Sequence, residues 1–546
     1  MDKKFIFIFF VVLFLTLFLR LYKLSDIPPG VNRDEASIAY TAYSLLQTGK
    51  DEYGRFLPLS FQSFGDWKLP FYMYVSMPFI KVFGLSELGV RLPSALFGIA
   101  TVAVTFFLVK QLFHNNFLSF LTMFLIALSP WHLHLSRVES ESNTAVFLTT
   151  LAVLLFLKSL SSKAWLIIPS AIMLALTYFT YAGNYIFTTL LICGIIIIYR
   201  KAIIKTRYFL IASLVFIFLS GFIGFYTLGG NTTKVSGIGI FGDPAIVHAK
   251  IEIPRNQHEN PQSLFAKTFH NRFIFASEAI FQNYLKSFSP EFLFIKGGDN
   301  KAHNIANFGN MYILEAPFLF LGILYLIMAK KNKESWLVLW WFLIAPMAAS
   351  ITKDAPHTNR MFAIFPILPL ISAIGYVKAR EWVMVRFKSI KNIAAGIVSL
   401  LLLFNVLIYF DRYFVHFPKN EGESWGAGYK NLTNLISQKR FLPKKIVISR
   451  PEYSPYIFLL FYQKYDPEKY QASAIRYLPT DDGFVHVKGF DRYEFREINW
   501  GEDIKISNRL LIDVPSQIPE FVKKEYQKID VSLPNGKIMF TIIETK

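Results

Sequence analysis

Long apolar runs, separated by short polar segments, fill most of the first 410 residues. A helix rises about 1.5 Å per residue, so a run of about 20 apolar residues can cross the hydrocarbon core of a bilayer. Several runs are joined by only a few residues, which predicts antiparallel neighbours. The pattern predicts about eleven membrane-spanning helices, at residues 5–22, 93–113, 117–135, 143–159, 164–182, 184–199, 208–228, 312–329, 335–351, 360–377 and 391–410.

Two longer loops, 23–92 and 229–311, interrupt this pattern. In the first, residues 34–47 carry apolar side chains at helical spacing and end at Gly49, which predicts a short amphipathic helix lying in the membrane interface. A second interfacial helix is expected at 69–83. The second loop begins with Gly- and Thr-rich sequence and contains a similar pattern at 263–288.

The first apolar run follows Lys3 and Lys4 and lacks a small-residue cleavage site. We therefore expect an uncleaved span in which Arg20 reaches towards the interface. Cytoplasmic loops of membrane proteins are enriched in Lys and Arg, and alternate connections here carry most of these residues. The pattern predicts a cytoplasmic N-terminus, with both long loops and the tail outside. The residues are Lys158, Lys163, Arg200, Lys201, Lys205, Arg207, Lys330, Lys331, Lys333, Lys378, Arg380, Arg386, Lys388 and Lys391.

From Asp411 onward, short apolar runs alternate with polar turns, such as residues 481–483 and 534–536. This pattern predicts a small soluble α/β domain. The chain therefore divides into a polytopic all-α membrane domain, 1–410, and an extracytoplasmic domain, 411–546.

The composition agrees with this division and excludes several classes of function. A hydrophobic content of 53% and a mean hydropathy of +0.37 are too high for a soluble enzyme. The net charge of +19 is concentrated between the spans, so topology and anionic lipid explain it better than nucleic acid does. The one cysteine, Cys193, lies in an apolar run, which excludes an intramolecular disulfide or a cysteine-based zinc site.

Charged residues near membrane depth are costly, and several gather at predicted span ends on the outer side. Simpler roles are open to some of them: Asp34 could cap a helix, Arg137 could anchor a span end at the headgroups, and His132 and His134 could belong to an interfacial aromatic belt. Arg91 is expected to pair with an acid of the first loop. The candidates are Asp34, Glu35, Asp66, Lys68, His132, His134, Arg137, Glu139, Glu141, His270, Arg272, His303, Asp354, His357 and Arg360.

Several motifs in residues 20–140 resemble those of a known family. They are Asp34-Glu35, the turn Gly49 to Gly54, Gly65 to Pro70, Arg91 to Gly98 and Ser129 to Arg137. Together they resemble the GT-C fold glycosyltransferases of the protein O-mannosyltransferase and aminoarabinose transferase group. The predicted topology is similar to about residue 410. The segment Glu423 to Tyr429 is similar to a motif at the start of the outer domain in bacterial relatives.

The resemblance implies transfer of a sugar from a polyprenyl-phosphate carrier to an acceptor hydroxyl on the outer face of the cell membrane. The acceptor would be a protein, a lipid or a glycan. Asp34 would be the catalytic base with Glu35 in support, and a single displacement would invert the anomeric configuration. Cations would stabilise the departing phosphate, with Arg137 first and then Arg360 and Lys68. His357 would complete the substrate-binding set.

Some members of the family that the chain resembles hold a divalent cation between a first-loop carboxylate and a later histidine. Here Asp66 and His303 would take those positions, both also being candidates for substrate binding. However, Lys68-Leu69-Pro70 departs from the carboxylate-Lys-Pro-Pro form of the aminoarabinose group. Neither the metal nor that sugar therefore follows from the resemblance.

Two alternatives remain open from the sequence. A transporter or lipid flippase would also have many spans, but such proteins usually show paired repeats and broken helices at the midplane. The sequence shows neither feature, and its acids gather at one face instead. The second alternative is a GT-C enzyme of another branch, such as an oligosaccharyl or polymer-chain transferase.

Overall fold

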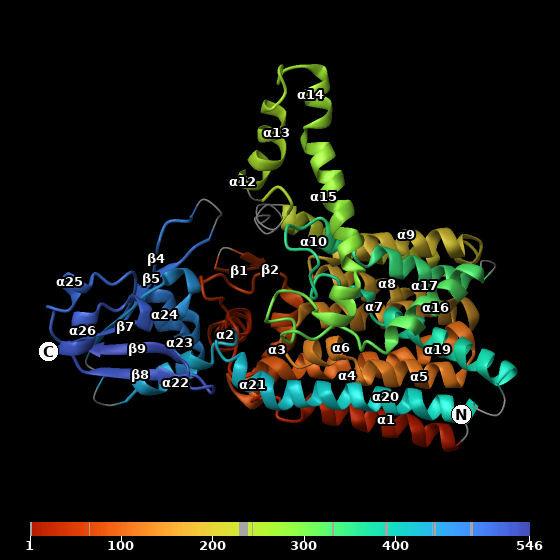
Figure 1. Cartoon of the computed structure of the whole chain (residues 1–546), viewed down its shortest axis with the longest axis horizontal. Helices are drawn as coiled ribbons and strands as arrows, with labels where there is room; N and C mark the ends of the chain where they lie inside the picture. The colour runs from red at the N-terminus through yellow and green to blue at the C-terminus, as the bar shows by residue number, and fades with distance from the viewer. Residues whose placement is uncertain are drawn as a thin grey trace. The chain divides into compact units, whose positions relative to one another are not determined.

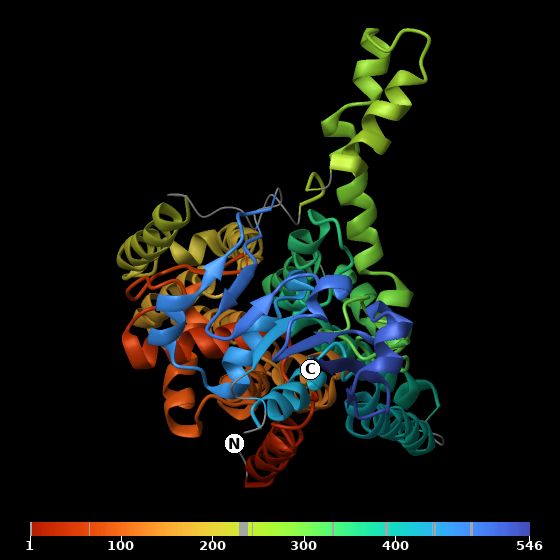
Figure 2. The ribbon, with the colours of Figure 1, turned by 90° about the vertical axis from the view of Figure 1, so that its left-hand side faces the viewer.

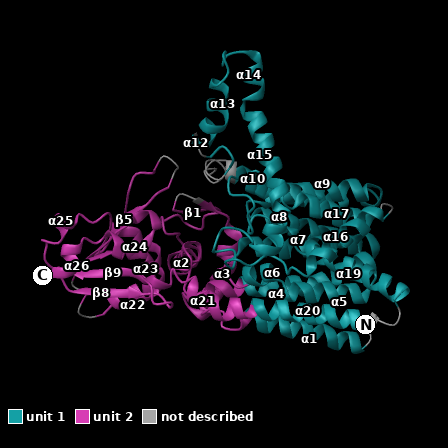
Figure 3. Cartoon of the chain, viewed as in Figure 1, with its two compact units in different colours: residues 1–20, 94–136, 140–409 teal, residues 21–93, 137–139, 410–546 magenta. Residues whose placement is uncertain are grey.

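The computed structural model describes residues 3–64, 66–228, 239–242, 244–329, 332–387, 391–438, 441, 444–480 and 484–545. These residues form two compact units, each built from several chain segments (Figure 3). Unit 1 comprises residues 1–20, 94–136 and 140–409, and unit 2 comprises residues 21–93, 137–139 and 410–546. Lys330, Lys331, Lys388, the predicted turn 481–483 and the Gly- and Thr-rich segment 229–238 lie outside the described residues.

Unit 1 is a set of apolar helices (Figure 1). Three of them, α1, α4 and α20, have one end in unit 2. The helices are α1 (Lys3–Leu21), α4 (Glu87–Phe113), α5 (Asn116–Leu128), α6 (Pro130–Ser136), α7 (Glu141–Ser161), α8 (Ile167–Tyr178), α9 (Asn184–Ile203), α10 (Phe209–Leu228), α16 (Glu315–Met328), α17 (Lys333–Ile344), α18 (Met347–Ser350), α19 (Ile367–Arg386) and α20 (Lys391–Asp411).

The predicted count of eleven spans is not confirmed. Among the described residues, six helices are long and apolar enough to cross a membrane, and α5 with α6 would make a seventh, bent by 60°. Prolines divide several of the predicted runs. Pro130 begins α6, Pro346 separates α17 from α18, and Pro366 precedes α19. Each proline lacks the N–H that a continuous helix would use, so the helix ends or bends there.

The second long loop forms a helical arm, defined here as residues 244–288 (Figures 1 and 2). Its helices are α12 (Pro244–Val247), α13 (Ile253–Asn256), α14 (Leu264–Phe269) and α15 (Arg272–Ser287). The helix expected over 263–288 is divided between α14 and α15. The reason is local: the Asn271 side chain accepts from the backbone N–H groups of Phe273 and Ile274 and starts a new helix.

Unit 2 combines the first long loop with the tail. The loop forms α2 (Arg33–Thr48), α3 (Pro70–Phe83) and a two-stranded sheet of β1 (Phe61–Ser63) and β2 (Asp66–Lys68). Both loop helices were predicted. The helices of the tail are α21 (Phe417–Asn420), α22 (Ala427–Ile436), α23 (Pro455–Gln463), α24 (Pro467–Ser473), α25 (Trp500–Asp503) and α26 (Glu520–Glu525).

The tail also contains a seven-stranded sheet in the order β4-β5-β6-β3-β7-β9-β8. The central strand β3 is parallel to β6 and β7, and the remaining pairs are antiparallel. This sheet confirms the α/β character predicted for the tail. The strands are β3 (Lys445–Ile448), β4 (Ile475–Arg476), β5 (Val487–Phe490), β6 (Tyr493–Phe495), β7 (Arg509–Asp513), β8 (Lys528–Ser532) and β9 (Ile538–Glu544).

The first loop and the tail share one hydrophobic core. Ala36, Ile38 and Tyr40 of α2 are buried in the same cluster as Ile457 and Leu460 of α23. Polar contacts follow the same junction: the Tyr462 hydroxyl accepts from the backbone N–H of Val31, and the Tyr40 hydroxyl donates to the Tyr465 carbonyl. The helix that begins with Arg33 and Asp34 therefore takes its position from the tail as well as from the loop.

Candidate active site

The N-terminus of α2 is capped by Asn32. The Asn32 side chain accepts from the Glu35 backbone N–H, and the Glu35 carboxylate accepts from the Asn32 backbone N–H in return. This reciprocal capping box satisfies two N–H groups that would otherwise lack partners in the first turn. The alternative in which Asp34 caps the helix is therefore wrong. Asp34 lies in the first turn of α2, where the helix dipole favours a negative charge.

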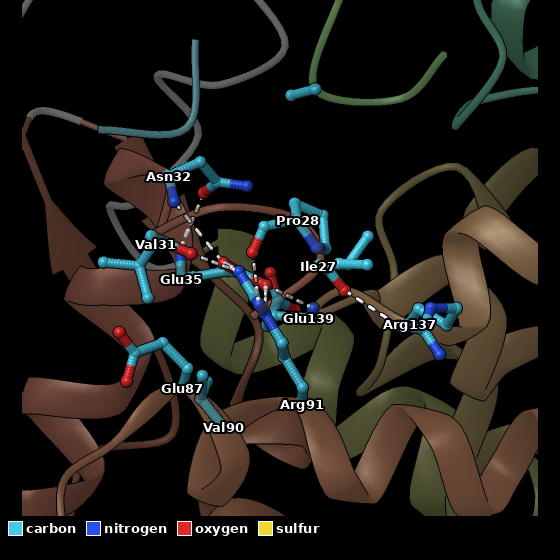
Figure 4. Close-up of polar contacts among 12 residues, drawn as sticks. Ile27, Pro28, Val31, Asn32, Glu35, Glu87, Val90, Arg91, Arg137 and Glu139 are labelled. Atoms are coloured by element: carbon cyan, nitrogen blue, oxygen red, sulfur yellow. Dashed lines mark hydrogen bonds and ion pairs between the residues drawn. The ribbon is translucent and has the colours of Figure 1, made fainter. Parts of the chain in front are cut away.

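Glu35 is fully buried and paired with Arg91 (Figure 4). Arg91 Nε donates to Glu35 Oε1 over 3.0 Å, and Arg91 Nη2 donates to Oε2 over 2.9 Å. The same guanidinium donates to the carbonyls of Leu24, Pro28 and Gly30. The predicted pairing of Arg91 with a first-loop acid is confirmed.

A third donor completes the surroundings of Glu35. The backbone N–H of Glu139 donates to Glu35 Oε1 over 2.9 Å. Both carboxylate oxygens are thus engaged inside the protein. Glu35 fixes the N-terminus of α2 through these bonds, which is compatible with the supporting role predicted for it.

Asp34 has very different surroundings from its neighbour. Its side chain is 59% exposed, and its Oδ1 accepts from Lys68 Nζ over 2.8 Å. Lys68 comes from β2, and its side chain is only 4% exposed, with Nζ 5.9 Å from the Phe64 ring centroid. The pair places an accessible carboxylate beside a buried ammonium. These are the two charges that the predicted chemistry requires.

Arg137 lies in the interior of unit 2. Its Nη2 donates to the backbone carbonyls of Tyr22, Lys23 and Ile27 at 2.7, 3.3 and 3.1 Å, the last of which is drawn in Figure 4. The guanidinium also lies over the rings of Tyr413 and Phe414. Arg137 therefore fixes the chain between α1 and α2, and these contacts give no support to its predicted role as the first phosphate ligand.

Unit 1 brings together His303, His357 and Arg360. The two imidazole rings have centroids 5.1 Å apart, and Arg360 donates through Nη2 to Asp354 and through Nη1 to the Thr352 hydroxyl. Burial, with His303 and Arg360 nearby, lowers the pKa of His357 to about 2. His357 is therefore neutral at physiological pH and can donate or accept a hydrogen bond.

His357 also lines a cavity of about 420 Å³, formed by residues 298–300 and 353–358. The lining residues include Asp299, Lys353 and Asp354. A cavity of this polarity suits a ligand rich in hydroxyl groups.

The positions of His132 and Arg20 differ from those expected from the sequence. Both are fully buried, and Arg20 Nη2 lies 2.8 Å from His132 Nδ1. Arg20 also donates to the Ala127 carbonyl, so it does not reach the interface as predicted. His132 is an interior residue and not part of an interfacial belt, while His134 Nε2 lies 3.0 Å from the Ala302 carbonyl.

The metal prediction stays a prediction. Asp66 lies on β2 of unit 2, but its side chain is outside the described part of the chain, and His303 belongs to unit 1. Among the described residues, no three His, Cys, Asp or Glu side chains form a group that could hold a metal ion.

Sequence reasoning missed two features of the site. The capping box was visible as Asn32-x-x-Glu35, the usual pattern of such a box. The contact of Arg20 with His132 joins residues 112 positions apart, and no local pattern indicates it.

The comparisons with known proteins agree with the predicted family. Residues 10–233 match the model of the dolichyl-phosphate-mannose-protein mannosyltransferase family. A search of the curated proteins finds no match. Among solved structures, ArnT from Cupriavidus metallidurans in the apo state is 13% identical with a TM-score of 0.57, covering 99% of this chain and 98% of ArnT.

ArnT bound to undecaprenyl phosphate has 11% identity, the same coverage and a TM-score of 0.56. The apo oligosaccharyltransferase of Archaeoglobus fulgidus has 11% identity and a TM-score of 0.47, over 84% of this chain and 64% of that protein. The ArnT structures share the fold of the whole chain, and the family match covers its first spans and first loop. The chain is thus a multi-pass membrane protein that shares the fold of ArnT, and its residues 10–233 resemble the dolichyl-phosphate-mannose-protein mannosyltransferase family.

Proposed function

We propose that this glycosyltransferase moves a sugar from a polyprenyl-phosphate donor to an acceptor hydroxyl at the outer face of the cell membrane. The observation that carries the residue assignment is the pair of Asp34 and Lys68 at the N-terminus of α2. The donor class is supported by the family match and by the likeness to a protein solved with undecaprenyl phosphate.

In the proposed reaction, an Asp34 carboxylate oxygen takes the proton from the acceptor hydroxyl. The acceptor oxygen then forms a bond with the anomeric carbon, and the bond from that carbon to the lipid phosphate breaks. The electron pair leaves with the phosphate, whose negative charge Lys68 stabilises. One displacement with one base inverts the anomeric configuration.

Lys68 is suited to this part by its burial. A buried ammonium interacts more strongly with an anion than an exposed one does, because less water screens it. When phosphate binds, Lys68 has a second anionic partner, which leaves the Asp34 carboxylate available to the acceptor. His357 and Arg360 are proposed to bind other parts of the substrate, and Asp66 and His303 keep their predicted roles in substrate or cation binding.

The direct test is consumption of the donor. Purified protein in nanodiscs is incubated with radiolabelled polyprenyl-phosphate hexose or pentose and with protein, lipid and glycan acceptors. The proposal predicts release of free polyprenyl phosphate and a labelled acceptor. Translocation of an intact donor would instead indicate a flippase. Transfer only from lipid-linked oligosaccharides would indicate another branch of GT-C enzymes.

A further inference from the structure

The helical arm is fixed at its root to one segment of unit 1. On the entering side, the Ile240 backbone N–H donates to the Ile351 carbonyl over 3.2 Å. On the returning side, Asn283 Nδ2 donates to the carbonyls of Ser350 and Thr352 at 3.1 and 3.0 Å. Because Ile240, which precedes the arm, and Asn283 of α15 bind the same three-residue segment, the root of the arm is fixed to the rest of unit 1.

The arm projects from the apolar helices of unit 1 in a direction across their axes. It follows the C-terminal end of α10 in the chain and precedes α16. In Figure 1, α14 and α15 run across the direction of α16 and α17, at one end of these two helices. In the view of Figure 2, turned by 90°, the arm again stands away from the helices of unit 1. A segment with this direction runs along the surface of a membrane that the helices cross.

One face of the arm is apolar and uncovered. Leu264 is 85% exposed and Phe273 is 76% exposed, and neither is covered by any described part of the chain. Removing large apolar side chains from water is favourable, so this face is suited to an apolar partner. The exposed members of this face are Leu264, Phe265, Phe269, Phe273, Phe281 and Leu285.

The opposite face of α15 is polar. Arg272, Gln282 and Lys286 lie on it, Phe273, Phe281 and Leu285 lie on the apolar side, and Glu278 lies at the boundary beside Leu285. Over residues 244–288 the chain has five Lys or Arg and three Glu, a difference of +2. An apolar stripe beside a polar face of this kind is typical of helices that lie in the headgroup region with their apolar side among the acyl chains.

We propose that the arm lies on the membrane surface, with the six apolar side chains from Leu264 to Leu285 inserted at the boundary between headgroups and acyl chains. The bilayer is the occupant that the direction of the arm supports, since α14 and α15 run across the direction of the apolar helices α16 and α17.

The root of the arm also reaches Arg360. Arg360 Nη1 donates to the hydroxyl of Thr352, the residue whose carbonyl accepts from Asn283. The lipid contact of the arm thereby sets the depth of the segment from Ser350 to Arg360. This consequence for substrate binding rests on the proposed function, which assigns Arg360 as a substrate-binding residue. The membrane contact of the arm does not depend on that assignment.

The test is a depth measurement on the full-length protein in nanodiscs. Cys193 is replaced by serine, and single cysteines at Phe273→Cys and, separately, Phe281→Cys carry an environment-sensitive fluorophore. Gln282→Cys, on the polar side of the same helix, is the matched control. Phosphatidylcholine with a spin label near the headgroup supplies the quencher. We expect about threefold more quenching at positions 273 and 281 than at 282.

Two results would overturn the proposal. Equal quenching at all three positions would show that the arm has no lipid-facing side. Absence of quenching at both 273 and 281 would place the apolar face in solvent or against protein. Cross-linking between copies through position 273 would then identify a second copy of the chain as the occupant.

Discussion

Asp34 and Glu35 are neighbours in the sequence, yet their carboxylates have opposite surroundings. Glu35 is enclosed by Arg91 and two backbone N–H groups, whereas Asp34 is more than half exposed beside Lys68. The buried acid fixes the helix start, so the exposed acid has a defined position. This division of labour is the basis of the proposed chemistry.

The ion pair of Glu35 with Arg91 gives a prediction at this scale. Glu35→Gln leaves a buried guanidinium without its anion, and removing one partner of such a pair costs about 3–5 kcal/mol of folding free energy. Thermal unfolding of the purified protein measures the loss. Glu87→Gln, which breaks the partly exposed pair with Lys430, should cost about 1 kcal/mol or less. Equal effects of the two substitutions would contradict this account.

At the scale of elements, the first loop and the tail meet closely at Gly30. Gly30 has a φ of +79°, and a Cβ there would lie 2.6 Å from the Trp425 carbonyl oxygen. Trp425 belongs to the segment Glu423 to Tyr429, which the sequence had singled out. Its ring lies 5.6 Å from the Arg91 guanidinium. The segment therefore supports the residue that holds Glu35.

Gly30→Ala should destabilise the junction by about 2–4 kcal/mol, because it adds a steric overlap to an unfavourable backbone conformation. Gly54→Ala is the matched control, since Gly54 has a φ of +83° but open space around its Cβ position. It should lose only about 1 kcal/mol. Unfolding of both variants under the same conditions checks the difference, and a larger loss for Gly54→Ala would contradict the close approach.

Glu52 gives the same junction a pH dependence. It is buried, its Oε2 accepts from the Tyr456 hydroxyl, and burial raises its pKa to about 7 despite Arg476 nearby. Between the unfolded value of 4.5 and about 7, the folded state binds more protons than the unfolded state. Stability therefore falls as the pH rises through this range and remains lower above it.

Glu52→Gln removes the charge and should remove this dependence. The gap between 4.5 and about 7 corresponds to about 3 kcal/mol, which is the upper bound on the gain expected at pH 8. At pH 4.5 the variant and the parent should be nearly equal. The measurement is unfolding at both pH values. A variant that is less stable at pH 8 would show that the charged form is stabilising.

At the scale of the whole molecule, the tail is part of the structure that carries Asp34. Residues of α2 and α23 are buried in one core, and Gln471 of α24 donates to the Ser44 hydroxyl and the Asp51 carbonyl. A chain ending at residue 410 would expose the apolar side of α2. We expect trypsin to cleave it after Arg33, Lys50 or Arg55 about tenfold faster than the full chain. Unchanged protection of these sites would contradict the shared core.

The sequence predicted those parts that depend on local pattern. The α2 helix, expected at 34–47, spans Arg33–Thr48, since its apolar spacing and Gly49 are local signals. The α/β tail was likewise visible in its alternating runs. The span count was not, because Pro130, Pro346 and Pro366 divide runs that hydropathy alone reads as continuous.

The sequence identified several residues of the candidate site, but it did not predict the contacts that each of them makes. Asp34 and Lys68 were both candidates, but their contact joins positions 34 residues apart. Arg137 was predicted to bind phosphate, and its contacts with three backbone carbonyls were not foreseen, because burial is decided by packing that no local signal reports.

The central claim is that Asp34 is the catalytic base, and the most direct measurement is the transfer rate of Asp34→Asn. Asp26→Asn is the control, since Asp26 is an exposed acid of the same loop. The rate of sugar transfer is compared for the two variants and the parent at equal amounts of folded protein. We expect Asp34→Asn to lose at least about a hundredfold in rate and Asp26→Asn to be unchanged. A rate for Asp34→Asn close to that of the parent would contradict the account.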